Sequence, residues 1–445
     1  MIEALRNAWR LPDVRNRLLI TLLILLVYQF AAHVPVIGVD KNALQTLLDP
    51  TQSSAAGFIG VLNLLSGGAV ANFSVLANGV YPYITASIII QLLVPIVPRW
   101  REIQKEPGGQ QKIQRFTYYL AVPMAILQSF SQIQIFTALG GGVQIIPGFG
   151  SDFMLTLAVI ASMTAGTMFA VWLGELITEQ GIGNGVSLII FSGIVASAPS
   201  NFAAMITNST DDGMRIWNVI LFIILTLISI VAIVFIQEGV RRIPVQYGKR
   251  VRGRKQYGGA TTHIPLKVNP VGMIPLIFSQ AIIALPAVVV NFFPQSDLTA
   301  SITQTFGNQQ GFIYWASFFA LTVAFTFFYS DVMVQNQDLA NNLQRNGGFI
   351  PGIRPGKRTE EYIIKVTRRV TVVGALFLGL IAIVPYFVEI INSVLFPTSF
   401  VAGVAGNPAT VLTGSGLIIL VGVVIDTLRQ LEAQLVMRHY EGFMR

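Results

Sequence analysis

The chain has 445 residues, of which 53% are hydrophobic and 11% are charged, and its formal net charge is +8. Soluble domains carry about 25% charged residues, so this composition excludes an ordinary soluble globular protein and indicates that lipid is the solvent for much of the chain. The chain has no Cys, which excludes disulfides and thiolate metal sites.

Ten apolar stretches are long enough to cross a membrane, because a bilayer core about 30 Å thick needs roughly 20 helical residues. They lie, in chain order, at residues 18–36, 79–98, 116–136, 153–174, 183–197, 216–236, 270–293, 312–330, 370–388 and 411–425. We predict a membrane-spanning helix at each. No small-residue cleavage site follows the first stretch, so we interpret it as a retained span and not as a signal peptide.

The basic residues support this number of spans. Lys and Arg collect in cytoplasmic loops. All 29 of them except Lys41 and Arg215 lie before the first span, after the second, sixth and eighth spans, or in the C-terminal tail. These segments all fall on one side of the membrane, so we expect both ends of the chain to be cytoplasmic.

The span interiors are free of formal charge. None of the ten predicted stretches contains Asp, Glu, Lys or Arg, whereas an ion-coupled secondary transporter, the main alternative, usually has such residues near the midplane. The chain also has no glycine-rich loop ending in Gly-Lys-Ser/Thr and no nucleophile–base signature. We therefore expect no enzymatic activity, no cofactor and no metal. His33, near the end of a span, is more simply an interfacial residue than a proton relay.

Two features are compatible with a passive path through the membrane. Residues Gly57–Gly79 are half-hydrophobic, rich in Gly and interrupted by Ser66-Gly67-Gly68. They form either an outer-surface loop or a short re-entrant helix, because irregular backbone at membrane depth is tolerated only inside protein or along a water-filled cavity. Val80 and Ile84, like Val186 and Ile190, share a helix face. These faces serve either ordinary packing or a hydrophobic constriction.

A long basic segment separates the sixth and seventh spans. Residues Glu238–Asn269 contain one Glu and eight basic residues: Arg241, Arg242, Lys249, Arg250, Arg252, Arg254, Lys255 and Lys267. Fewer charges would suffice to orient the protein. The segment is suited to adhesion to anionic lipid, to binding of RNA phosphates or to contact with an acidic protein surface.

Four stretches resemble the SecY family of protein-conducting channel subunits. They are "WLGELITEQGIGNGVSLIIFSGIV" (172–195), "GVYPYITASIIIQLL" (79–93), "THIPLKVNPVGMIP" (262–275) and "GGFIPGIRPGKRTEEYI" (347–363). They occur in the family's order, and the resemblance runs nearly from end to end. Asn78 departs from the pattern, because the family usually has an aliphatic residue there, and this difference bears on how a plug would dock.

The resemblance implies an all-α polytopic membrane protein, with ten transmembrane helices in two pseudo-symmetric five-helix halves (1–208 and 209–445) around a central pore. A re-entrant plug helix is expected at about 60–72, with Leu62, Leu64, Leu65, Ser66, Gly67 and Gly68. The implied pore ring is Val80, Ile84, Val186, Ile190, Ile277 and Ile419. The candidates for a hydrogen-bonded latch at a lateral opening are Thr85, Gln91, Asn184 and Gln280, although they also suit satisfaction of the backbone at kinks.

The family's activity is passage of unfolded secretory polypeptides across the bacterial plasma (inner) membrane, with sideways release of hydrophobic segments into lipid. A motor ATPase resembling SecA, or the ribosome, would supply the drive by docking on the basic loops 238–269 and 332–369. The expected docking residues are Arg241, Arg242, Lys249, Arg250, Arg252, Arg254, Lys255, Arg354, Lys357 and Arg358. Small membrane subunits resembling SecE and SecG, signal peptides, nascent polypeptides and membrane lipid complete the expected partners.

Overall fold

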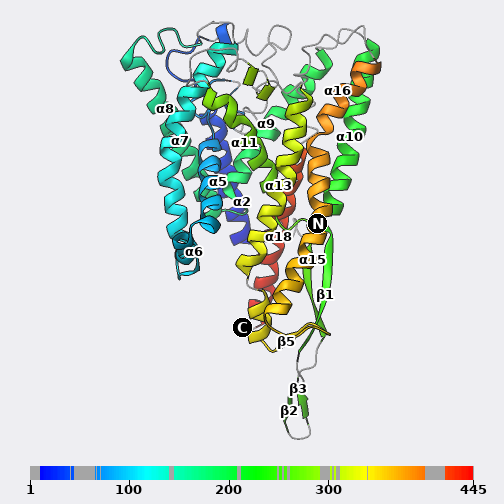
Figure 1. Ribbon diagram of the computed structural model, residues 1–445. Helices are drawn as coiled ribbons and strands as arrows, with labels where there is room; N and C mark the ends of the chain where they lie inside the picture. The colour runs from blue at the N-terminus through cyan, green and yellow to red at the C-terminus, as the bar shows by residue number, and fades with distance from the viewer. Residues whose placement is uncertain are drawn as a thin grey trace.

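The fold is a bundle of long helices with a small β extension at one end (Figure 1). The computed structural model describes residues 11–40, 42–44, 66, 68–70, 72–139, 145–207, 212–247, 250–252, 255–257, 261–290, 301–302, 305–306, 311–337, 339–395 and 416–443. The β extension lies beyond the end of the bundle where the basic loops after the sixth and eighth predicted spans meet.

Helices occupy most of the described chain. They are α2 (Pro12–Ala31), α5 (Tyr81–Ile96), α6 (Pro98–Lys105), α7 (Gly109–Leu139), α8 (Phe153–Gln180), α9 (Gly185–Thr207), α10 (Asp212–Glu238), α11 (Ile274–Val290), α13 (Phe312–Gln337), α14 (Leu339–Arg345), α15 (Lys357–Ala382), α16 (Val384–Leu395) and α18 (Leu417–Phe443). Each of the ten predicted stretches overlaps at least one of these helices. By length and composition, five helices of the described chain can cross a membrane, and the bent α5–α6 pair makes a sixth. Crossing by all ten stays a prediction.

Prolines end two of the predicted spans early. The helix axis turns by 104° between α5 and α6, where Val97 is extended (φ −94°, ψ 111°) before Pro98, because a residue that precedes Pro avoids the helical region. The predicted stretch 370–388 is likewise not one helix: α15 ends at Ala382 and α16 begins at Val384. Pro385 has no N–H to continue the helical ladder across that break.

The expectation of an all-α chain is wrong for the basic segment, which forms strands. They are β1 (Val240–Tyr247), β2 (Arg250–Arg252), β3 (Lys255–Tyr257), β4 (Thr261–Lys267) and β5 (Gly348–Phe349). One antiparallel sheet has the order β4-β1-β5, with Ile243 opposite Ile264 and Gln246 opposite Phe349, and β2 pairs with β3 in a separate hairpin. In β1, buried Ile243 and Val245 alternate with exposed neighbours, which is the period of a half-buried strand.

The sheet joins two loops that are about 100 residues apart in the sequence. We call β1, β4, β5, α14 and the first turns of α15 the β-platform. It has a small hydrophobic core of its own: Ile243, Val245, Leu266, Leu343, Ile350 and Ile363. The loops after the sixth and eighth predicted spans are therefore one structural unit.

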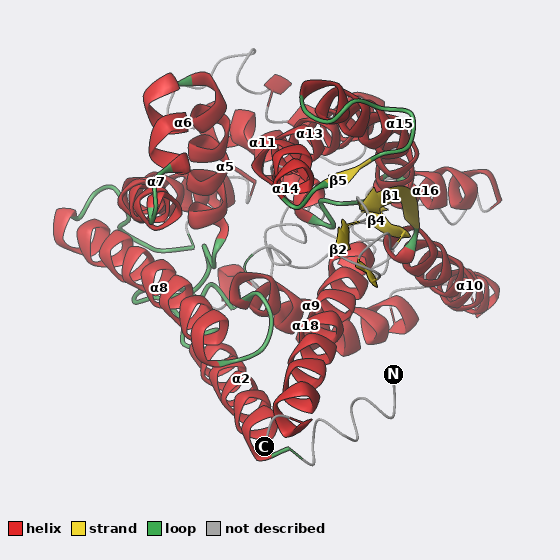
Figure 2. Ribbon diagram, turned by 90° about the horizontal axis from the view of Figure 1, so that it is seen from below, coloured by secondary structure: helices red, strands yellow, loops and turns green. Residues whose placement is uncertain are grey.

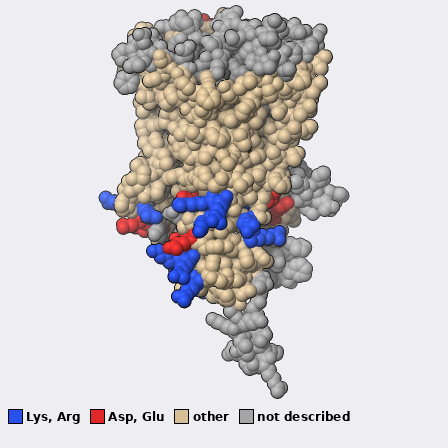
Figure 3. Space-filling model, turned by 45° about the vertical axis from the view of Figure 1, so that its right-hand side comes forward, with Lys and Arg blue, Asp and Glu red and all other residues tan. Residues whose placement is uncertain are grey.

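The helical bundle is apolar inside and outside. Its main buried cluster draws residues from α2, α5, α8, α9, α11, α13, α15 and α18. Large apolar side chains such as Leu26 of α2 and Phe235 of α10 are nevertheless exposed, as expected where lipid is the solvent. Figure 3 shows this as a belt of uncharged surface, with the visible Lys, Arg, Asp and Glu of the described chain gathered almost entirely below it.

Candidate functional site

The six residues of the predicted pore ring come together in the main buried cluster. Val80 precedes α5 and Ile84 lies in it, while Ile190, Ile277 and Ile419 come from α9, α11 and α18; these five are at most 6% exposed. Val186, at the start of α9, is partly buried against the same cluster. The six are bulky, branched side chains without hydrogen-bonding groups, the chemistry that excludes water and ions from a constriction. That they form a ring stays a prediction.

Close backbone approach positions α9 and its two ring residues. A Cβ added to Gly185 would lie 1.8 Å from the Gly174 carbonyl oxygen of α8, so only glycine permits this crossing. The adjoining loop contacts α18, where the Gly183 N–H donates to Gln430 Oε1 over 2.9 Å. Asn184 Oδ1 accepts from the Ser187 N–H over 3.2 Å and so caps the start of α9.

The described part of the predicted plug lies against the same cluster. Buried Ser66 accepts a hydrogen bond at its carbonyl from Tyr28 Oη of α2. A Cβ on Gly79 would come within 2.5 Å of Ser66 Cα, and Gly79 has a φ of +51°, so this approach requires glycine twice over. A Cβ added to Gly68 would lie 3.9 Å from the Gly193 carbonyl oxygen of α9. Leu62, Leu64, Leu65 and Gly67 lie outside the described residues.

Asn78, the departure from the family pattern, is directed toward α7. Its Nδ2 donates to Ser129 Oγ over 2.6 Å, and Ser129 Oγ in turn donates to the Ala125 carbonyl over 2.7 Å. The Asn78 amide is buried just before α5, and Ser129 of α7 supplies its acceptor. This avoids the cost of an unpaired polar group. Asn78 therefore holds α5 against α7.

Three of the four predicted latch residues bond locally. Thr85 Oγ1 donates to the Pro82 carbonyl and accepts from Gln128 Nε2 of α7. Gln91 Nε2 donates to Ser87 Oγ one turn away in α5. These bonds and the cap made by Asn184 fit the alternative in which such residues satisfy polar groups near kinks and helix ends. Gln280 is buried in α11. A latch role for these four stays a prediction.

A residue outside the predicted latch set makes a hydrogen bond between α5 and α11. Tyr81 Oη donates to the Ala281 carbonyl over 2.9 Å, and both residues are buried. We call the contact between α5 and α11, which lie side by side in Figure 2, the seam. Sequence reasoning missed Tyr81; the available signal was a phenolic hydroxyl in an apolar helix, which needs a partner when buried.

The β-platform displays the predicted docking residues. Arg241 and Arg242 of β1, Arg354, and Lys357 and Arg358 of α15 are all exposed. The β2–β3 hairpin, which carries Arg250, Arg252 and Lys255, projects farthest from the bundle (Figure 1). Lys249 and Arg254 lie outside the described residues. The described docking residues thus lie on the β-platform and on the hairpin that extends from it.

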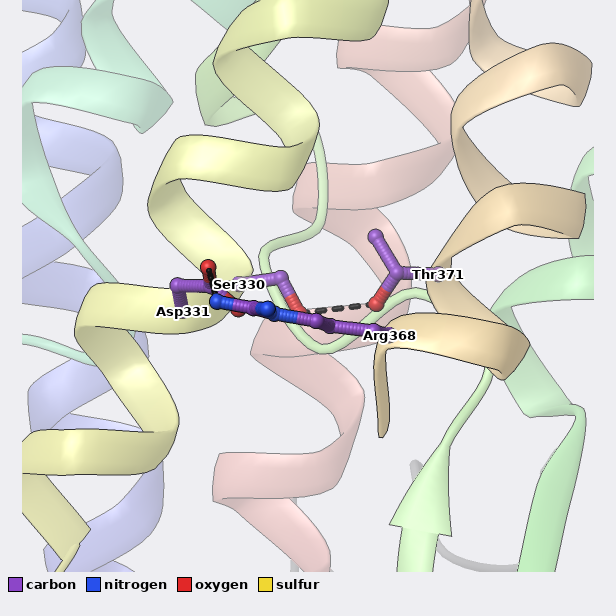
Figure 4. Close-up of polar contacts among 4 residues, drawn as sticks. All are labelled: Ser330, Asp331, Arg368 and Thr371. Carbon is purple, nitrogen blue, oxygen red and sulfur yellow. Dashed lines mark hydrogen bonds and ion pairs between the residues drawn. The ribbon is translucent and has the colours of Figure 1, made fainter. Parts of the chain in front are cut away.

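Polar pairs hold the helices next to the β-platform. Arg368 of α15 makes a two-pronged ion pair with Asp331 of α13, with Nε–Oδ1 and Nη2–Oδ2 distances of 3.0 and 2.8 Å. One turn away, the hydroxyls of Ser330 and Thr371 are hydrogen-bonded over 2.8 Å (Figure 4). These bonds fix α13 to α15 where the bundle meets the β-platform.

Sequence comparison identifies the family. The sequence model described as SecY matches residues 74–428. The chain belongs to the SecY family. Curated SecY translocase subunits of Bacillus licheniformis and Bacillus subtilis are each 40% identical to it over 454 residues, which is the full length of both chains in each pair. The same subunit of Streptomyces coelicolor is 40% identical over 459 residues, again at full coverage.

Solved structures share the fold. One is described as "The structure of a protein conducting channel"; it has a TM-score of 0.59 and 17% identity, and the match covers 95% of this chain and 96% of that one. A second, whose description concerns the plug domain of the SecY protein and a membrane seal, has a TM-score of 0.61 and 18% identity, with 95% and 92% covered. These structures show the same fold, which agrees with the family that the sequence relatives give.

Proposed function

We propose that the protein is the channel-forming subunit of a protein translocase, which passes unfolded secretory polypeptides through its centre. The observation that supports this proposal is that all six residues of the predicted ring belong to, or pack against, the one buried cluster, while Ser66 lies against Gly79 directly before Val80. Membership of a family whose curated members are translocase subunits supports it.

The side chains of the predicted ring suit a constriction that excludes water and ions and still lets a polypeptide pass. Val and Ile side chains offer ions no ligands, and an apolar constriction is costly for water and ions to enter. They also offer a moving chain no hydrogen bonds that would hold it. With all six residues buried or partly buried, the arrangement would be that of a closed channel. The plug of that closed state would be the stretch at about 60–72, in which Ser66 accepts a hydrogen bond from Tyr28 and lies against Gly79.

The opening toward lipid would lie at the seam. In this proposal, residues 1–208 and 209–445 are two halves, ten helices cross the membrane, and both termini are cytoplasmic. Parting of α5 from α11 would release hydrophobic segments sideways into lipid. The bacterial plasma membrane is the location consistent with the SecY-family relatives, and small subunits resembling SecE and SecG would accompany the chain.

The β-platform would bind the motor ATPase or the ribosome that drives transport. Its exposed arginines and lysine suit an acidic motor surface, such as that of a SecA-like ATPase, or ribosomal RNA phosphates, with the strong salt dependence that phosphate binding brings. Solved relatives of the fold include ribosome-bound channels: one is Sec61 from a canine ribosome–channel complex, at a TM-score of 0.50 and 16% identity. The channel itself would then need no catalytic group.

Disulfide trapping tests the channel proposal, since the chain has no Cys of its own. A single Cys is introduced as Ile84→Cys in the pore ring, and a secretory polypeptide with one Cys is stalled in the reconstituted complex and oxidised. The matched control is Leu227→Cys on α10, where the side chain is 59% exposed on the apolar exterior.

A cross-link at residue 84 and none at residue 227 is the expected result. If the stalled chain is engaged and neither Cys cross-links, or if both react equally, the polypeptide does not pass the ring and the proposed path is wrong.

A further inference from the structure

We propose that the Tyr81 hydroxyl is the latch of the seam, and that it determines how hydrophobic a segment must be to part α5 from α11. This proposal rests on the proposed function, because it concerns the sideways release of segments from a translocation channel. Its basis is the hydrogen bond from Tyr81 Oη to the Ala281 carbonyl, which joins residues 200 positions apart.

The two helices of the seam are each held firmly on their other side. On the α5 side, Asn78 donates to Ser129 and Gln128 donates to Thr85, and the Tyr83 ring stacks on Tyr118 with centroids 5.5 Å apart. All three contacts join the α5 region to α7. They make α5 and α7 one body.

On the α11 side, aromatic packing fixes α11 to α13. The Phe278 ring lies edge-on to Phe325 and Tyr329 of α13, with centroids 6.3 and 5.0 Å apart. The α5–α11 contact is less extensive than either the α5–α7 or the α11–α13 contact. A separation of the bundle in this region therefore falls between the two bodies, where Tyr81 meets Ala281.

The latch lies beside the pore ring. Tyr81 directly follows Val80, and Ala281 is one helical turn from Ile277. A motion that separates Tyr81 Oη from the Ala281 carbonyl therefore also moves Val80 away from Ile277. Parting of the seam and widening of the ring are linked by position in the chain.

The hydroxyl favours the closed arrangement. In the apolar interior, a tyrosine hydroxyl that loses its acceptor is left unpaired unless water or the passing chain replaces the bond, whereas the Ala281 carbonyl lies inside α11 and keeps its place in the helical ladder. A strongly hydrophobic segment offsets this loss by its own transfer into lipid, whereas a weak one does not. Without the hydroxyl, less hydrophobic segments will be able to part α5 from α11.

The test uses the complete complex in vesicles, with its companion subunits and motor ATPase. It is given secretory polypeptides whose signal segments contain an increasing number of leucines in an alanine background. The readout is the leucine number at half-maximal transport. Tyr81→Phe and Tyr81→Met both remove the hydroxyl but differ in shape. Tyr119→Phe is the matched control, because Tyr119 lies on α7 and is 74% exposed.

We expect Tyr81→Phe and Tyr81→Met to lower the threshold by about one to three leucines, because one interhelical hydrogen bond and the insertion of one leucine have free energies of similar order. Tyr119→Phe should leave the threshold unchanged. A wild-type complex that transports none of the series overturns the proposed function. A wild-type complex that transports them, with a threshold that Tyr81→Phe does not move, overturns the latch alone. A threshold that falls with Tyr81→Met but not with Tyr81→Phe assigns the effect to loss of the aromatic side chain and also overturns the latch.

Discussion

Two contacts between the chain before Thr207 and the chain after Asp212 differ in how they are made. Each is bridged by a hydrogen bond between a backbone group and a side chain: the Gly183 N–H donates to Gln430 beside α9, and Tyr81 Oη donates to the Ala281 carbonyl at the seam. They differ in the chain around the bond, because a Cβ on Gly183 would lie 3.2 Å from Thr427 Oγ1, whereas neither α5 nor α11 contains a glycine. Figure 2 shows the two contacts in different parts of the bundle.

The difference indicates which contact is built to persist. Beside α9, a Cβ on Gly183 would meet Leu188 and Thr427 at 3.0 and 3.2 Å, so the donor lies in a close crossing that favours glycine. At the seam, the donor is the end of a tyrosine side chain between apolar helix faces, which can exchange protein for lipid or for a passing segment when α5 and α11 part. In the proposed channel, the α9–α18 contact is therefore the fixed side and the seam is the opening side.

The largest expected effect comes from displacement of α9. Gly185→Ala places a Cβ 1.8 Å from the Gly174 carbonyl oxygen, and neither backbone can yield without moving α8 or α9. We expect most of the folded protein to be lost, as measured by the yield of monodisperse protein in detergent and by thermal unfolding. Gly311→Ala is the matched control, because a Cβ there meets nothing within 4 Å. Equal yields for the two variants would contradict the tight crossing.

A smaller effect is expected from the hydrogen bond that joins this crossing to α18. Gln430→Leu removes the acceptor of the Gly183 N–H at similar side-chain volume. Because Gln430 lies at an exposed position, water partly replaces it, and we expect a loss of about 1 kcal/mol in the free energy of unfolding. Gln430→Glu keeps an acceptor oxygen and should lose less. Chemical unfolding in detergent measures both, and equal losses would argue against the hydrogen bond.

The helices could be predicted from the sequence, because a run of apolar residues of bilayer length has few other stable forms. The burial of the predicted ring residues was foreseeable for a related reason, since a four-residue spacing within each motif places two apolar side chains on one face, and the family resemblance supplied the remaining members; that they form a ring stays a prediction. Helix ends were harder. The α7 helix begins at Gly109, seven residues before the predicted stretch, because a polar extension outside the membrane leaves no apolar signal.

The β-platform and the seam latch could not be predicted, for a shared physical reason. The pairing of Gln246 with Phe349 and the bond from Tyr81 to Ala281 both use backbone groups, which every residue has. A backbone partner does not depend on residue type, so the sequence does not indicate it. Nor does the sequence indicate that two loops far apart along the chain pair with each other. The polar residues that did stand out in α5, Thr85 and Gln91, bond within α5 and to α7 instead.

The smallest expected effect comes from an ion pair between α13 and α15, which is outside the seam. The Asp331–Arg368 pair joins α13 to α15 at a largely exposed position, where ion pairs contribute little and are weakened by salt. Asp331→Arg places two arginines next to each other and should slightly lower the thermal unfolding midpoint at low ionic strength. The exchange of Asp331→Arg with Arg368→Asp should restore the midpoint, and high salt should abolish the difference.

Because α11 and α13 are expected to move as one body, Asp331→Arg should not shift the leucine threshold. A shift as large as that expected for Tyr81→Phe would show that opening also parts α13 from α15, and the contrast between one opening side and one fixed side would then be wrong.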